Sequence, residues 1–140
     1  MNKICTTIEQ SQKLIELGID VNTADMEYMF LKRDGSKVSN IPFVKDDDEP
    51  EWPNDSSYDF IPCWSLTALL ELMPPYLFEF ERGIDLNIYR NLNGKGWHVS
   101  YMPNNIEDMK KDKFRQITNG DNPIDAAFEM VCWLLENKNL

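Results

Sequence analysis

Cys63 and His98 are the residues whose chemistry could make a nucleophilic site. Cys63 precedes a predicted helix, where the helix dipole lowers the pKa of a thiol, and His98 is the only histidine. In contact, the two would define a small hydrolase or transferase. No spacing brings them together, and a buried Cys63 with His98 on a solvated sheet face explains the surrounding residues more simply. We predict no catalytic residue and keep the cysteine-dependent enzyme as the alternative.

The three cysteines, Cys5, Cys63 and Cys132, are an odd number without CxxC spacing. This pattern predicts neither a disulfide framework nor a zinc site. Apolar neighbours around Cys63 and Cys132 would bury these thiols and raise their pKa values. We therefore expect reduced cysteines with a structural role.

Residues 46–59 form an acidic segment that contains two prolines. They hold seven acids and no base, which is most of the net charge of −10. The acids are Asp46, Asp47, Asp48, Glu49, Glu51, Asp55 and Asp59. Carboxylates can hold calcium, but the run from Asp46 to Glu49 lacks the alternating ligands and the glycine of an EF-hand loop. We predict a long solvated loop at about residues 45–60 and no metal site.

Trp52 lies between Glu51 and Pro53 in this acidic segment. An aromatic ring there can anchor a protein interface, and it can equally fold back as a lid over a sheet or a helix. The concentrated charge would steer a basic partner towards the segment. The binding residues that we predict from the sequence are Asp46, Asp47, Asp48, Glu49, Glu51 and Trp52.

The overall charge argues against several classes of partner. Lysine and arginine number 14 against 24 acids, so phosphate backbones and anionic lipids are repelled, and the mixed run at 110–115 is too short to reverse this. No stretch approaches the roughly 18 apolar residues of a membrane span, and the N-terminus lacks the apolar core of a signal peptide. Phosphate-loop, dinucleotide-binding and zinc-protease motifs are absent. We expect a cytoplasmic protein without nucleic acid, membrane or cofactor.

The first helix is predicted at about residues 7–17. Thr6 and Glu9 have the spacing of a capping box, and Gly18 is a typical helix stop. Further along, Asp34-Gly35 lies between short apolar runs and favours a small hairpin.

Two more helices are predicted from their caps. Ser65 is a suitable N-cap for a helix that must end before Pro74. Asn122 followed by proline is a strong start for a last helix running to about Asn137. The apolar residues of this helix make it the expected centre of the core: Ile124, Ala127, Phe128, Val131, Leu134 and Leu135.

Strand patterns occur at 76–81, 84–90 and 97–102, with a fourth at 114–118. Their short turns predict an antiparallel meander, and their alternation predicts one apolar face. The expected fold is α+β, with an antiparallel β-meander of three to five strands packed against two or three helices. The length of 140 residues predicts a single domain.

Several short motifs carry a resemblance. They are Glu9-Gln10-Ser11 with Leu14 to Gly18, Thr23-Ala24-Asp25-Met26, Ile61 to Leu66, Asp121 to Ala126 and Glu129 to Leu135. With this order of elements, the chain resembles a family of small uncharacterised proteins encoded by phages and prophages of gut anaerobes. From Ser65 onward it is also loosely similar to the phage ABA sandwich domain. The matching residues are caps and core positions, so the resemblance implies a fold and no site residue.

These features predict an accessory protein of a phage or mobile element. Its expected activity is non-enzymatic binding of another protein, as an inhibitor of a host or rival factor. If the protein is phage-encoded, we expect it in the cytosol of the host cell. The alternative function is the small hydrolase or transferase that would use Cys63 and His98.

Overall fold

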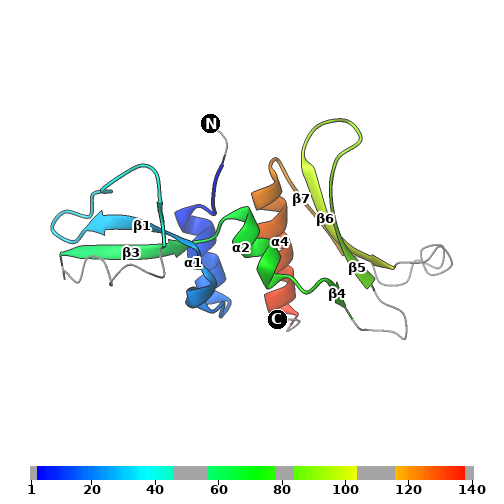
Figure 1. Ribbon diagram of the computed structural model, residues 1–140, viewed down its shortest axis with the longest axis horizontal. Coiled ribbons are helices and arrows are strands. Elements are labelled where there is room, and N and C mark those ends of the chain that lie inside the picture. The colour runs from blue at the N-terminus through cyan, green and yellow to red at the C-terminus, as the bar shows by residue number, and fades with distance from the viewer. Residues whose placement is uncertain (1–2, 46–56, 78–83, 104–115, 138–140) are drawn as a thin grey trace.

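The computed structural model describes residues 3–45, 57–77, 84–103 and 116–137, and it has an α+β fold with helices between two antiparallel sheets (Figure 1). The elements are α1 (Ile8–Glu16), the 3-10 turn η1 (Val21–Thr23), β1 (Met26–Leu31), β2 (Phe43–Val44), β3 (Tyr58–Cys63), α2 (Leu66–Leu72), β4 (Tyr76–Leu77), β5 (Ile84–Arg90), β6 (Trp97–Pro103), β7 (Gln116–Gly120) and α4 (Pro123–Glu136). The predicted fold class is confirmed.

The cap of α1 differs from the prediction. Thr7 is the N-cap, since its Oγ1 accepts a hydrogen bond from Gln10 N at 3.1 Å and its own N–H donates to Gln10 Oε1 at 3.0 Å. The capping box of Thr6 and Glu9 is therefore wrong by one residue. Thr6 is fully buried and makes other bonds.

The other predicted helix ends are confirmed. The chain leaves α1 at Gly18, whose φ of 95° is the left-handed conformation that glycine adopts without strain. Ser65 caps α2, and Asn122 caps α4 with Pro123 in the first turn. Each cap satisfies backbone donors that the helix itself leaves unpaired.

The first sheet has the strand order β2-β1-β3. The predicted turn at Asp34-Gly35 is present, with an isolated bridge between Phe30 and Lys37, but β1 pairs along its whole length with β3. Because β3 begins at Tyr58, the predicted loop to residue 60 extends too far. The strand escaped prediction because its apolar residues do not alternate cleanly and because it contains Pro62, which is tolerated on an edge strand.

The second sheet is the predicted meander, with the order β4-β5-β6-β7. β5 and β6 pair from Ile84↔Pro103 to Arg90↔Trp97. β7 pairs with β6 through Thr118↔Val99 and its neighbours, and the first two residues predicted for this strand, 114–115, lie outside the described residues. Val99 and Tyr101 face the core as their alternation indicated, since both are fully buried.

α4 lies on β6 and β7, and α2 packs against α4. The main core joins the helices to the second sheet through Leu14, Trp64, Leu69, Val99, Tyr101, Phe128, Met130, Val131 and Leu134, among others. The expectation that the last helix is the centre of the core is confirmed by its eight buried residues. In the described parts of the chain, no helix has the length and apolar character needed to cross a membrane.

Candidate functional site

The predicted binding residues Asp46, Asp47, Asp48, Glu49, Glu51 and Trp52 lie outside the described residues. The chain on either side of them belongs to the first sheet. Lys45 N donates to Asp25 O at 2.9 Å just after β2, and Lys32 N donates to Ser57 O at 3.0 Å just before β3. Asp59, the one described acid of the predicted loop, is in β3 with its carboxylate 3.7 Å from Lys32 Nζ. Both ends of the acidic segment are thus attached to this sheet.

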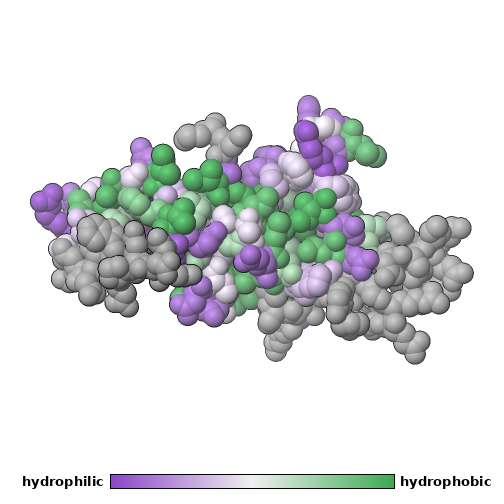
Figure 2. Space-filling model, viewed as in Figure 1, coloured by the Kyte–Doolittle hydropathy of each residue, from purple (hydrophilic) through white to green (hydrophobic). Residues whose placement is uncertain are grey.

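The β2 side of the first sheet exposes four large apolar residues, which we call the apolar edge. They are Val38, Ile41, Phe43 and Val44, with exposed fractions of 43%, 62%, 39% and 74%. Figure 2 shows hydrophobic side chains gathered on the visible face over this sheet. Isolated exposed apolar residues are common, but here four lie within seven positions beside an acidic segment.

Cys63 is the last residue of β3 and is fully buried. Its neighbours in a small second core are Cys5 and Met26, with Tyr28 packed against them. The thiols of Cys5 and Cys63 lie in one buried cluster and interact, and Cys5 Sγ lies 3.4 Å from Tyr28 Oη. Burial of Cys63 was predicted, whereas its contact with Cys5 was not. No local pattern could have indicated it, because the two residues are far apart in the sequence.

Tyr28 contacts both Thr6 and Cys5 through its hydroxyl group. The hydroxyl of Tyr28 donates to Thr6 O at 3.1 Å. The same hydroxyl oxygen lies 3.4 Å from Cys5 Sγ, and either atom can be the donor in that contact. The interaction with Tyr28 lowers the pKa of Cys5, so it favours the thiolate.

The surroundings of the three thiols give them different pKa values. The interaction with Cys63 lowers the pKa of Cys5 to about 7 against the opposing effect of burial, with further help from Tyr28 and from the charge of Lys3. The same interaction, together with burial, raises the pKa of Cys63. Burial raises the pKa of Cys132 to about 12. The directions predicted for Cys63 and Cys132 are correct, and Cys5 is the most acidic thiol of the three.

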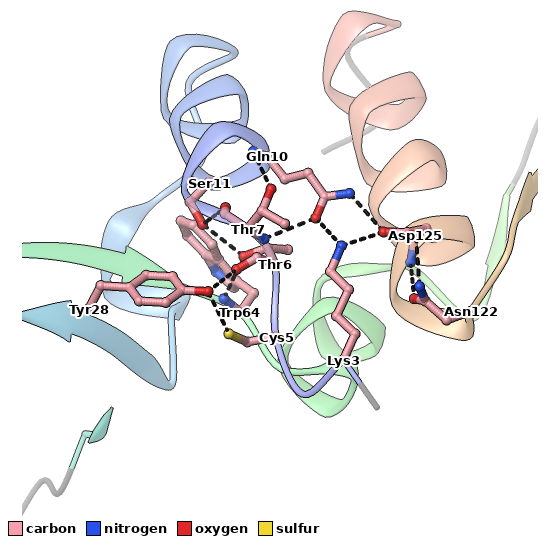
Figure 3. Close-up of polar contacts among 10 residues, drawn as sticks. All are labelled: Lys3, Cys5, Thr6, Thr7, Gln10, Ser11, Tyr28, Trp64, Asn122 and Asp125. Atoms are coloured by element: carbon pink, nitrogen blue, oxygen red, sulfur yellow. Dashed lines mark hydrogen bonds and ion pairs between the residues drawn. The ribbon is translucent and has the colours of Figure 1, made fainter. Parts of the chain in front are cut away.

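Thr6 and Trp64 hold the two cysteine-bearing segments side by side (Figure 3). Thr6 N donates to Trp64 O at 2.9 Å, and Trp64 N donates to Thr6 Oγ1 at 3.0 Å. The hydroxyls of Thr6 and Ser11 are 2.8 Å apart, and Trp64 Nε1 donates to Thr23 Oγ1 at 3.0 Å. Cys5 and Cys63 are each next to this pair, so their backbones have fixed positions.

His98 lies in β6 of the second sheet, on the face opposite to α4. Its ring stacks on Tyr89 with centroids 5.1 Å apart, at the edge of a shallow hollow that Asn91, Leu92 and Asn93 also line. Its Nδ1 is buried and has no hydrogen-bond partner among the described residues. Its partial exposure agrees with the predicted place on a solvated sheet face.

Cys63 and His98 belong to different sheets, with α2 and α4 between β3 and β6 in Figure 1. The pair considered for nucleophilic chemistry is therefore not assembled as a hydrogen-bonded site. Among the described residues, no group of three or more histidine, cysteine or acidic side chains could hold a metal ion. The calcium alternative at Asp46 to Glu49 lies outside the described residues.

Comparison of the chain with protein-family models, with curated proteins and with solved structures gives no match.

Proposed function

We propose that the protein is a non-enzymatic module that binds another protein through the apolar edge and the adjoining acidic segment. The observation that carries the proposal is the exposure of Ile41 and Val44, at 62% and 74%, along the edge of a sheet that also anchors both ends of residues 46–56. Burial of these exposed apolar side chains by a partner is favourable, by roughly 25 cal/mol for each Å² of apolar surface removed from water.

The charge of the acidic segment specifies the partner. Residues 46–59 hold seven acids and no base, so the complementary surface has apolar residues bordered by lysine and arginine. A second copy of this chain would bring the same acids together and would be repelled. The resemblance to phage-encoded proteins suggests a cytosolic partner, a host or rival factor, whose activity the module blocks.

The test compares variants that change the apolar edge with a matched control. Ile41→Ser with Val44→Ser removes the two most exposed residues of the edge, and Leu92→Ser changes a fully exposed leucine at the far turn of the second sheet. Partners captured by the three proteins from cell lysate are quantified, and the affinity of each purified partner is then measured at two salt concentrations.

A supporting partner binds wild type and Leu92→Ser equally and the edge variant at least tenfold more weakly. Its affinity also falls as the salt concentration rises, because the screening length for charges decreases from about 8 Å at 0.15 M to about 3 Å at 1 M. Equal binding by the edge variant, or a partner that does not respond to salt, would contradict the proposal. A stable homodimer held by the apolar edge would contradict it as well.

A further inference from the structure

The contact between Cys5 and Cys63 joins two segments with fixed backbones. Cys63 is paired with Met26 in the ladder between β1 and β3. Cys5 precedes Thr6, which is bonded to the residue after Cys63 through two hydrogen bonds of 2.9 and 3.0 Å. Both thiols belong to the same small buried cluster, so they need little backbone movement to meet.

We propose that Cys5 and Cys63 are a redox-sensitive pair that closes to an intramolecular disulfide on oxidation. Closure would connect the segment before α1 covalently to the end of β3, at the junction between the first sheet and the helices. Neither the binding surface nor the proposed function requires this bond. The inference therefore stands on the thiol pair alone.

The chemistry has two steps with a peroxide as the oxidant. Cys5 attacks one peroxide oxygen, so that an S–O bond forms, the O–O bond breaks, and the thiol proton leaves with the other oxygen as water. Cys63 then attacks the sulfur of the sulfenic acid, so that the S–S bond forms, the S–O bond breaks, and the thiol proton leaves with the oxygen as a second water. Two thiols lose two electrons, and one hydrogen peroxide becomes two waters.

The acidities of the two thiols assign their roles. The interactions with Cys63 and Tyr28 and the charge of Lys3 lower the pKa of Cys5 to about 7, so it is the thiol that reacts with peroxide at neutral pH. Cys63 lies in the same buried cluster and serves as the resolving thiol. Cys132 is buried in α4 with a raised pKa and is the internal control.

The experiment treats the full chain at pH 7 with hydrogen peroxide under native conditions. Free thiols are counted after unfolding, and peptides are mapped by mass spectrometry. We expect the count to fall from three to one, a loss of two hydrogen atoms from the chain, and a linked peptide containing Cys5 and Cys63. Oxidation should slow about tenfold for each unit of pH below the pKa of Cys5.

Two variants separate the roles. In Cys63→Ser the sulfenic acid on Cys5 has no resolving thiol and should be trapped by dimedone, whereas Cys132→Ser should still lose two thiols. The wild-type result alone tests the proposal if a variant fails to fold. Retention of all three thiols by wild type, oxidation of Cys132 first, or disulfides between chains in place of the internal bond would overturn it.

Discussion

The ammonium of Lys3 is bonded to the carboxylate of Asp125, so the segment before α1 is tied to the first turn of α4. Gln10 completes the contact, because its Oε1 accepts from Lys3 Nζ at 2.5 Å and its Nε2 donates to Asp125 Oδ1 at 2.9 Å. Two parts of the chain that are more than 100 residues apart in the sequence meet at this carboxylate (Figure 3).

We expect Asp125→Asn to reduce the dependence of the free energy of unfolding on pH in the acidic range. Burial favours the neutral acid, but bonds from Lys3, Gln10 and Asn122 outweigh it and hold the pKa of Asp125 below its usual value. An unfolded aspartate titrates at about 3.9, so the stabilisation is present above about pH 4 and is lost as pH falls through the lower folded value.

Urea unfolding at a series of pH values measures this. The difference in free energy of unfolding between wild type and Asp125→Asn should be largest at pH 7 and shrink towards about pH 2.5. Asp59→Asn, at an exposed carboxylate, is the control and should track wild type. A difference that stays constant across this range would show that Asp125 acts by packing instead of by charge.

Thr6 and Thr7 have different roles, and substitution should separate them. Thr6→Val keeps the shape but leaves the buried N–H of Trp64 without its acceptor, which costs about 1–3 kcal/mol. Thr7→Ala removes the N-cap of α1 and costs about 1 kcal/mol. Chemical denaturation gives both values. A near-neutral Thr6→Val would mean that Thr6 is not required at this junction.

Gly120→Ala should be strongly destabilising. A Cβ at this position would lie 2.4 Å from Ala126 N and 2.7 Å from Asp125 Cβ, so β7 and α4 would have to separate. Overpacking usually costs about 1–3 kcal/mol, and rigid backbone at this contact puts the cost at the upper end. Asn119→Ala, at the exposed neighbour in β7, should change stability far less. Equal melting temperatures for the two variants would contradict the close packing of β7 on α4.

Phe128→Ala should lower stability by about 3–5 kcal/mol through lost burial and a cavity. Phe128 lies in the main core at 4% exposure, and Glu129 on the same helix faces solvent. Glu129→Ala is the matched control and should remain close to wild type. Similar small losses in thermal unfolding from both variants would place α4 at the periphery of the core.

Local signals in the sequence predicted what is local in the structure. Ser65 and Asn122 cap their helices because the capping side chain and the backbone donor it satisfies lie within a few residues of each other. The alternation around Val99 and Tyr101 predicted the face of β6 that packs on α4. The meander follows because its strands are joined in sequence order.

The features that escaped prediction depend on contacts between distant residues. Thr6 and Thr7 are equivalent as caps in the sequence. Thr7 becomes the cap because the side chain of Thr6 accepts the hydrogen bond of Trp64 N–H. β1 and β3 pair across a long intervening segment, so no turn signal in the sequence indicates that they are neighbours. Cys63 was recognised as a candidate, but the thiol that it contacts belongs to a segment before the first helix.

The central position of α4 determines when the core can form during synthesis of the chain. All other described elements precede it in the chain, yet it fills the space between α2 and the second sheet. A nascent chain therefore displays the apolar sides of α2 and β6 until residues 123–136 leave the ribosome. Such exposed surface is what chaperones bind and what aggregates form from. The core consequently closes late, in a step that waits for the last helix to be translated.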